Sequence, residues 1–370
     1  MEPLKNVYSP AFIDSLTTLL KHVYPGLNRN AFTKAVFNSD WDSKELKQRM
    51  KHLAHVLQQF LHQDYKRDIQ TIIEWVHYLK GDSETKQSFQ YLFLAEYVEI
   101  FGREDLALSL KAIEEITQYT SCEFAIRPFL IKHPEKVMKQ MLKWSTHKNA
   151  SVRRFSSEGS RPRLPWGMAI AAFKKDPTLI LPILENLKND ASLYVRKSVA
   201  NNLNDIAKDN PEVVIDLIKK WKGKSDHTDW IIKHGSRTLL KKAHAEVLGL
   251  FDLHTAVRCS VSNLTLNKKH TALGDDISFS FELETDPKKE SKLRIEFAVY
   301  YAKAAGKTSR KLFKITEKMY PKASNVVISK RISFKDLTTR KHYSGKHKVC
   351  LLYTSPSPRD LSTSRMPSSA

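Results

Sequence analysis

Apolar residues recur with the period of an amphipathic α-helix from Ala11 to about Leu250. Between Leu46 and Leu61, for example, they follow one another mostly at spacings of three and four positions. Glycine is scarce in this region, and short breakers such as Gly102 separate the helical segments. The pattern predicts a large domain built almost entirely of helices.

Three segments within this region repeat one pattern, a proline followed by apolar residues three, four, seven and ten positions later. Such a stripe is typical of an amphipathic helix that a proline opens at its first turn. The prolines lie 43 and 34 residues apart, which is in the range of stacked helical-pair repeats. They are Pro134, Pro177 and Pro211. We therefore expect a helical-repeat solenoid with a concave wall.

The period changes from helix to strand near His254. Apolar and polar residues then alternate in several segments that turn-rich pieces separate. These segments are 257–261, 277–283, 293–299 and 326–334. The predicted fold class is therefore mainly α, with a solenoid over residues 1–253 followed by a small all-β, immunoglobulin-like sandwich over residues 254–350.

Residues 351–370 lose all periodicity and become rich in serine and proline. Such a composition predicts a disordered tail. The segment also resembles translated sequencing-adaptor read-through, and an artefact of that kind would cut the last strand of the sandwich near Cys350. We give this segment no part in the function.

The charge of the chain narrows the choice of partner. Lys and Arg number 61 against 40 Asp and Glu, which gives a net charge of +21 and a pI near 9.7. This balance favours nucleic acid or an anionic membrane surface.

Three cysteines are too few for a disulfide framework, and the sequence shows neither a leader peptide nor about eighteen consecutive apolar residues. We expect a cytoplasmic protein without a membrane span.

A basic pair recurs on the second helix of each predicted repeat, at 153–154, 196–197 and 233–234. Residues at one position of successive repeats lie along one face of the superhelix, where they can follow a phosphate backbone. A solvated helix face explains a single pair at least as well, so it is the recurrence that raises the DNA interpretation to an equal footing.

Two segments, 120–129 and 155–167, carry polar residues where a helical repeat normally has apolar ones. In the second segment two prolines and two glycines interrupt the helix within nine residues. A glutamate, two arginines and a tryptophan lie in the same break. An irregular loop of this kind lowers stability relative to a continuous helix, so its presence indicates a function.

The residues of these segments form a specific motif. The sequence SEGSRPRLPW at 157–166, with EFAIRPF at 123–129 and VRKSVANNLND at 195–205, resembles the AlkC branch of the alkylpurine DNA glycosylases. That family is built from HEAT-like repeats, and one of its subfamilies carries a C-terminal immunoglobulin-like domain. The resemblance extends over residues 1 to about 350, with the domains in the same order.

The resemblance implies a monofunctional DNA glycosylase that acts on double-stranded DNA. Its substrates would be cationic alkylated bases such as 3-methyladenine and 3-methylcytosine, excised without full rotation of the nucleotide out of the duplex. Carried over by motif, the acidic residues at the lesion are Glu123, Glu158 and Asp205, and the aromatic residue beside the deoxyribose and base is Trp166. The expected protein is a monomer with no cofactor and no metal ion.

These residue types suit the chemistry. A base alkylated on a ring nitrogen is positively charged and leaves readily, so carboxylates need only stabilise the oxocarbenium-like sugar and position a water. A tryptophan adds a cation–π attraction of about 1–2 kcal/mol. Taken singly, each acidic residue is explained as well by an ion pair or an exposed helix position, and Trp166 by the core, so the motif carries the assignment.

We expect the basic residues around this site to contact phosphate without reading base sequence. They are Arg127, Arg153, Arg154, Arg161, Arg163, Arg196, Lys197, Lys233 and Arg237. The alternative function is a non-catalytic helical-repeat scaffold that binds nucleic acid or an acidic protein. The sandwich either embraces DNA through basic loops such as 267–270 or only stabilises the end of the solenoid.

Overall fold

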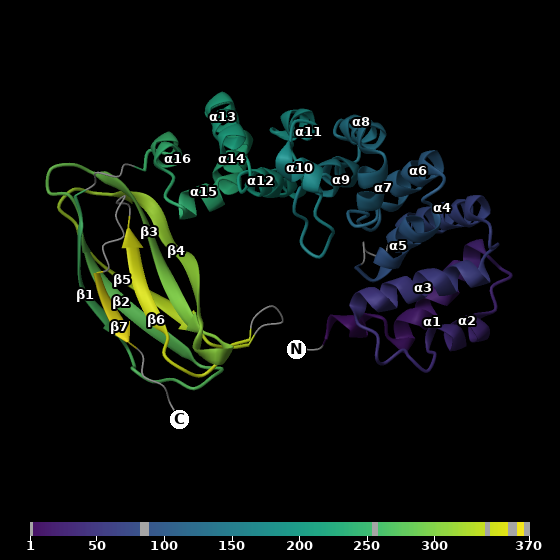
Figure 1. The fold of residues 1–370 in the computed structure, drawn as a ribbon, viewed down its shortest axis with the longest axis horizontal. Helices are drawn as coiled ribbons and strands as arrows, with labels where there is room; N and C mark the ends of the chain where they lie inside the picture. Colours follow the sequence, from purple (N-terminus) through teal and green to yellow (C-terminus); the bar gives the residue numbers. More distant parts are fainter. Residues whose placement is uncertain (1–2, 82–88, 254–257, 337–340, 354–360, 366–370) are drawn as a thin grey trace. The chain divides into compact units, whose positions relative to one another are not determined.

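The structure is a computed structural model that describes residues 3–81, 89–253, 258–336, 341–353 and 361–365. Helices fill the first two thirds of the chain and strands the last third, as the hydrophobic periodicity predicted (Figure 1). Among the helices of the described residues, none is long and apolar enough to cross a membrane.

The helices of the described residues follow one another with short connections. In chain order they are α1 (Pro10–Val23), α2 (Arg29–Val36), α3 (Leu46–Phe60), α4 (Tyr65–Gly81), α5 (Leu92–Phe101), α6 (Leu106–Ile116), α7 (Ile126–Lys132), α8 (Pro134–Trp144), α9 (Ala150–Gly159), α10 (Ala171–Lys175), α11 (Leu181–Leu187), α12 (Leu193–Ile206), α13 (Pro211–Trp221), α14 (Asp226–Gly235), α15 (Arg237–Lys241) and α16 (Ala245–Leu250). Short 3₁₀ helices span Leu4–Val7, Phe89–Tyr91 and Ala304–Gly306.

The chain divides between Thr238 and Leu239 into two compact units. The border predicted at 253/254 adjoins residues 254–257, which lie outside the described residues. Helix α16 belongs to the second unit, where Lys292 Nζ donates to the carbonyl of Phe251 just after this helix at 3.0 Å.

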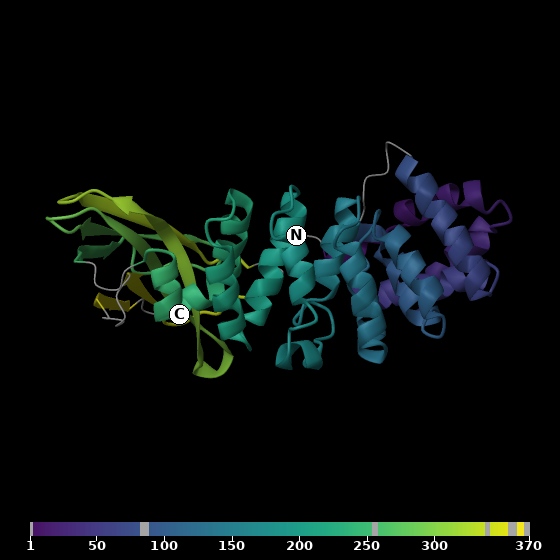
Figure 2. The same cartoon turned by 90° about the horizontal axis from the view of Figure 1, so that it is seen from above.

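In the first unit the helices stack in curved rows (Figures 1 and 2). The outer row includes α8, α11 and α13, and the inner row includes α9, α12 and α14, with α12 packed between α9 and α14. Each outer helix and the inner helix that follows it form one repeat. The three helical-pair repeats predicted from the sequence are thus confirmed.

Two of the three repeat prolines open a helix, as predicted. Pro134 and Pro211 occupy the first turn of α8 and α13. The prediction is wrong for Pro177, because α11 begins only at Leu181. Pro182 lacks an N–H, and its ring clashes with the carbonyl four residues earlier, so a regular helix cannot run through it from Pro177. Residues 178–180 form a turn instead.

The tryptophan that ends an outer helix links neighbouring repeats. Nε1–H of Trp144 donates to Oε2 of Glu114 at 2.7 Å, and Nε1–H of Trp221 donates to Oε2 of Glu185 at 2.8 Å. Both rings are buried, and a buried N–H without an acceptor costs about 1–3 kcal/mol. Each tryptophan therefore helps to fix one repeat on the one before it.

The second unit contains an antiparallel sandwich. Its sheets have the strand orders β1-β2-β5 and β4-β3-β6-β7. The strands are β1 (Ser260–Leu266), β2 (Asp276–Glu284), β3 (Ser291–Ala302), β4 (Thr308–Tyr320), β5 (Asn325–Ser333), β6 (Lys348–Tyr353) and β7 (Leu361–Arg365). Alternate residues of β2 are buried, and Phe279 and Phe281 of β2 share the core with Phe297 of β3.

Strands β6 and β7 reach into the segment 351–370, which the sequence predicted to be a disordered or artefactual tail. Strand β6 continues to Tyr353, and β7 pairs with it in antiparallel fashion. Pairing along a sheet uses backbone groups that any non-proline residue supplies. A strand can therefore pair even where its side chains show no hydrophobic period. The other residues beyond Tyr353 lie outside the described residues.

Candidate active site and DNA-binding residues

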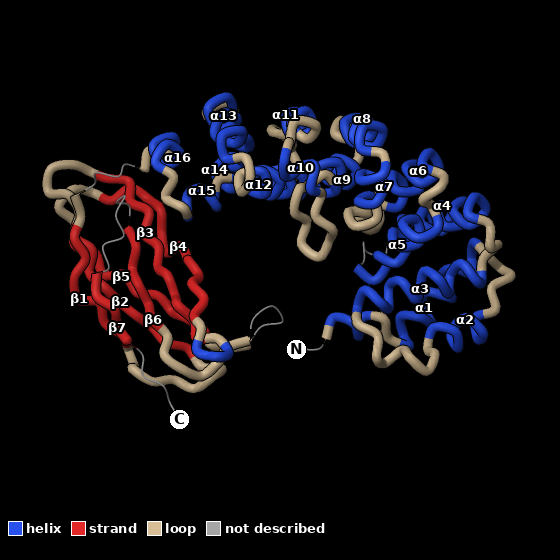
Figure 3. The backbone as a smooth tube through the Cα atoms, in the orientation of Figure 1, coloured by secondary structure: helices blue, strands red, loops and turns tan. Residues whose placement is uncertain are grey.

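The loop between α9 and α10, residues 160–170, lies on the inner side of the first unit (Figure 3). Its two prolines prevent α9 from continuing. The N–H of Ile170 donates to the carbonyl of Pro162 at 3.1 Å and closes the base of the loop. Trp166 lies at the turn of this loop with a φ of +64°, and 57% of the residue is exposed.

A hollow of about 470 Å³ opens beside this loop. Two of the three predicted acidic residues, Glu123 and Glu158, line it, and so does Trp166. Phe124 and Tyr194 add further aromatic rings to its wall. The hollow thus combines carboxylates with aromatic surface, as the predicted chemistry requires.

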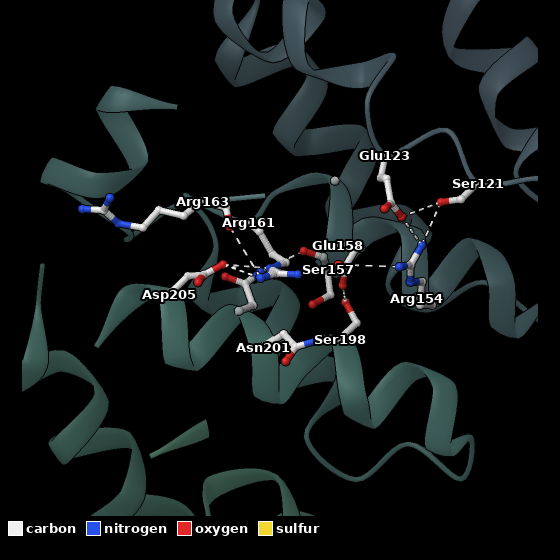
Figure 4. Close-up of polar contacts among 12 residues, drawn as sticks. Ser121, Glu123, Arg154, Ser157, Glu158, Arg161, Arg163, Ser198, Asn201 and Asp205 are labelled. Atoms are coloured by element: carbon white, nitrogen blue, oxygen red, sulfur yellow. Dashed lines mark hydrogen bonds and ion pairs between the residues drawn. The ribbon is translucent and has the colours of Figure 1, made fainter. Parts of the chain in front are cut away.

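Glu123 lies just before α7, and its side chain is 16% exposed. Its Oε2 accepts a hydrogen bond from Ser121 Oγ at 2.7 Å and pairs with Nη1 of Arg154 (Figure 4). The guanidinium of Arg154, from α9, also lies over the ring of Tyr194, 4.8 Å from the ring centre. Glu123 is therefore held in place by a residue that lines the same hollow.

Glu158 lies on α9 one turn after Arg154 and is 5% exposed. Its Oε1 accepts a hydrogen bond from Nη1 of Arg161 at 2.6 Å and is 3.6 Å from Nη2 of Arg154. Its Oε2 accepts from Oγ of Ser198 on α12 at 2.6 Å. A buried carboxylate requires such partners, because removing an unpaired charge from water is strongly unfavourable.

Asp205 on α12 is 2% exposed and does not line the hollow. Arg161 lies between Asp205 and Glu158, since its Nε donates to Oδ2 of Asp205 at 2.8 Å while Nη1 binds Glu158 (Figure 4). Lys208 Nζ donates to the other oxygen of Asp205 at 2.8 Å. The structure joins the three predicted carboxylates in one cluster, but only two of them face the hollow.

Glu123, Arg154, Glu158, Arg161 and Asp205 form what we call the acid–arginine chain, in which the charge alternates from residue to residue. Burial lowers the pKa of Arg154 and of Arg161, but the adjacent carboxylates outweigh burial, and the pKa of each arginine is raised overall. Both arginines therefore stay cationic and keep the carboxylates in fixed positions.

Arg127 was predicted to contact phosphate, and the structure contradicts this. Its side chain is completely buried. Its Nη1 donates to the carbonyl of Gly159 at 3.1 Å, and its Nε donates to the carbonyl of Met168. Burial, followed by repulsion from Arg161, lowers the pKa of Arg127 to about 10. Arg127 holds the 160–170 loop against α9, where no phosphate can reach it.

The recurring basic pair has a structural cause at its first position. Nη1 of Arg153 donates to the carbonyls five and six residues before it, both at 2.9 Å. Nη1 of Arg196 makes the same two bonds at 2.7 and 2.8 Å. Arg153 also forms an ion pair with Asp190 through Nε at 2.6 Å. These two arginines fix the loop inside each repeat, so their recurrence does not require DNA.

The remaining basic residues of the predicted set differ in how they are placed. Arg163 pairs with Asp209 near the surface, with a distance of 2.5 Å between Nη2 and Oδ1. Lys233 and Arg237 are half-buried. Lys197 is exposed on α12, which leaves its ammonium accessible to a phosphate.

The sequence interpretation assigned no role to Ser198, Tyr194 or Lys47. Ser198 lies three residues after Val195 on the buried stripe of α12, and a polar residue on such a stripe is a signal that could have been used. Tyr194 lines the hollow under Arg154. Lys47 reaches the 160–170 loop from 119 residues away, which no local pattern reveals.

The helical-repeat unit matches the family of the DNA alkylation repair enzymes. The chain belongs to this family, whose sequence profile matches residues 43–244. Residues 260–353 match the C-terminal Ig-like domain described for the uncharacterised protein YhaZ. These matches confirm the family and the domain order that the sequence motifs predicted.

Two relatives cover nearly the whole chain. YhaZ of Bacillus subtilis strain 168 is 42% identical over 352 residues, which is 95% of this chain and 96% of that protein. The alkylpurine DNA glycosylase AlkC of Pseudomonas fluorescens, solved with DNA that contains an abasic site analogue, is 33% identical. The two structures cover each other completely, with a TM-score of 0.90. The chain therefore has the fold of AlkC.

Proposed function

We propose that this protein is a DNA glycosylase that hydrolyses the N-glycosidic bond of 3-methyladenine and 3-methylcytosine in double-stranded DNA. The observation that carries the proposal is the placement of Glu123 and Glu158 on a hollow lined by aromatic rings. In a chain of net charge +21, carboxylates held at such a hollow are suited to a positively charged ligand. The DNA present in the AlkC structure supports a DNA partner.

The two carboxylates at the hollow would act on the sugar rather than on the base. An alkylated base already carries a positive charge, so it needs no general acid in order to leave. As the bond breaks, positive charge develops on the deoxyribose, and Glu123 and Glu158 stabilise it and orient the attacking water. Trp166 and Tyr194 contribute cation–π attraction to the lesion before the bond breaks.

We infer that the nucleotide is not fully rotated into a closed pocket. Trp166 and Tyr194, which line the hollow, are 57% and 43% exposed. A lesion can therefore meet both rings at the surface of the protein. Base-flipping enzymes instead enclose the extruded base in a snug pocket.

Asp205 takes a different role from the one that the motif assigned. Because Arg161 separates it from the hollow, Asp205 acts through that arginine as a positioning residue. The carboxylate fixes Arg161, which in turn fixes Oε1 of Glu158.

We further propose that the enzyme hydrolyses the base without cleaving the DNA strand. A lyase requires an amine that forms a Schiff base with the sugar. The residues that line the hollow in the described part of the chain include no lysine. Borohydride should therefore trap no covalent adduct between the protein and damaged DNA, whereas a trapped adduct would contradict this part of the proposal.

The direct test is to incubate the purified protein with methylated duplex DNA and to identify the free bases by chromatography. We expect 3-methyladenine and 3-methylcytosine in the supernatant at rates well above those of spontaneous release. A protein that binds the duplex but releases neither base would be a scaffold, and the proposal would be wrong.

Two basic residues of the recurring pair should separate stability from DNA binding. We expect Arg153→Met to lower stability by about 2–3 kcal/mol, because it removes several charge-assisted hydrogen bonds, and to leave DNA affinity nearly unchanged. Lys197→Met should leave stability unchanged but weaken binding, with the slope of log affinity against log salt reduced by about one. Thermal unfolding and titration of a labelled duplex measure both. Equal losses of affinity in the two variants would contradict the assignment.

A further inference from the structure

Trp166 is held in an unusual way for a residue at a candidate active site. Its φ of +64° lies in the left-handed region, and residues other than glycine adopt this backbone conformation only at a cost in free energy. The residue belongs to neither a helix nor a strand, and its ring is largely exposed. Packing of the ring therefore does not fix it, and contacts of its backbone must do so.

Lys47 supplies such a contact from a distant part of the chain. This residue lies in the first turn of α3, and its Nζ donates a hydrogen bond to the carbonyl of Trp166. The same ammonium lies over the ring of Phe124, 4.9 Å from the ring centre. Phe124 and Trp166 both line the hollow. One side chain thus ties together two aromatic residues of its wall.

The charge of Lys47 would oppose a cationic ligand nearby unless other groups balanced it. Lys47 helps to lower the pKa of two carboxylates of α5, those of Glu96 and Glu99, but burial outweighs it and raises the pKa of both, that of Glu99 to about 7. Glu96 is 8% exposed and lies 3.9 Å from Nζ of Lys51, which is one helical turn from Lys47. The protein therefore places the positive charge of Lys47 against the loop, and the carboxylates of α5 offset it only in part.

We infer that Lys47 is a positioning residue for the reaction, which sets the place of Trp166 and Phe124 at the hollow without touching the substrate. The inference rests on the proposed glycosylase function. A misplacement of about 1 Å at a reacting centre lowers a rate by about 10²-fold, so a tether of this kind has a measurable effect. Its loss should slow the chemical step and leave the binding of duplex DNA intact.

Lys51 provides a matched control. It carries the same charge on the same helix, its side chain is 60% exposed, and it forms an ion pair with Glu96 rather than a contact with the loop. Lys47→Met and Lys51→Met therefore remove equal charge, but only the first removes the contacts with Trp166 and Phe124. Lys47→Arg keeps a donor and a cation at the same place.

The experiment measures single-turnover release of 3-methyladenine as a function of protein concentration. For Lys47→Met we expect the maximal rate to fall about 10²-fold, with less than a twofold change in the concentration that gives half of that rate. Lys51→Met should match the wild type, and Lys47→Arg should recover most of the rate. A Lys47→Met rate equal to that of Lys51→Met, or a Lys47→Arg rate as low as that of Lys47→Met, would overturn the inference.

A second measurement does not depend on activity. The fluorescence anisotropy decay of Trp166 is obtained as the difference between each protein and the same protein carrying Trp166→Phe. We expect faster local motion of Trp166 in Lys47→Met and wild-type motion in Lys51→Met. Unchanged motion would overturn the inference. If the wild type releases no base, the proposed function fails, and this measurement alone still decides whether Lys47 holds the loop. If Lys47→Met unfolds more easily than Lys51→Met, the rate of the Lys47→Arg variant decides the inference, because that variant keeps a donor and a cation at position 47.

Discussion

Glu158→Gln should abolish most of the release of 3-methyladenine while leaving the affinity for duplex DNA equal to or slightly above that of the wild type. Glutamine keeps the volume of Glu158 and can still bond to Arg161 and Ser198. It removes the negative charge that would stabilise the sugar. The loss of one such preorganised electrostatic contact lowers kcat by about 10²–10³-fold.

The assay compares the rate of base release with the affinity for an undamaged duplex of the same sequence. Glu212→Gln is the matched control, because Glu212 is exposed in the first turn of α13 and does not line the hollow. It should behave like the wild type in both measurements. A Glu158→Gln protein that keeps half of the wild-type rate would show that the carboxylate at this position does not take part in the reaction.

Arg161→Met should destabilise the first unit by about 3–5 kcal/mol, because it leaves two buried carboxylates without their shared cation. Arg161 is 6% exposed and binds Glu158 and Asp205 at 2.6 and 2.8 Å. The remaining partner of Asp205, Lys208, does not reach Glu158 through any contact in the described structure. Base release should fall as well, since Glu158 loses the residue that fixes its Oε1.

Arg163→Met separates this effect from the loss of a surface charge. The pair between Arg163 and Asp209 has side chains that are 37% and 25% exposed. A pair of this kind contributes about 0–1 kcal/mol, so the variant should unfold close to the wild-type temperature. Thermal and denaturant unfolding of both variants measure the difference. Similar losses in the two proteins would show that burial does not make Arg161 special.

Much of the fold follows from the spacing of apolar residues. The change of period near residue 254 predicted two units of different class, and the proline-led stripes predicted paired helices. The prediction that Pro177 opens a helix is wrong for a local reason, because a second proline five residues later moves the start of α11 to Leu181. The pairing of β6 with β7 could not be predicted from hydrophobic residues, because backbone hydrogen bonds form it.

The candidate site was less predictable than the fold, because its geometry depends on residues far apart in the chain. The motifs indicated that Glu123, Glu158 and Asp205 belong together, but they did not show that Arg161 lies in front of Asp205. The recurrence of Arg153 and Arg196 predicted a track for phosphate, yet each residue bonds to its own loop. A repeated residue can serve the repeat itself as readily as a ligand.

Arg154 pairs with both carboxylates at the hollow, and this pairing has a consequence for how the protein would search undamaged DNA. An undamaged nucleobase is neutral, so it cannot displace the guanidinium from these carboxylates. A methylated base carries its own positive charge and competes for the same oxygens. We therefore expect the protein to move rapidly along undamaged duplex and to pause only where a cationic base displaces Arg154 from these carboxylates. Recognition would then depend on competition between two cations and not on shape complementarity.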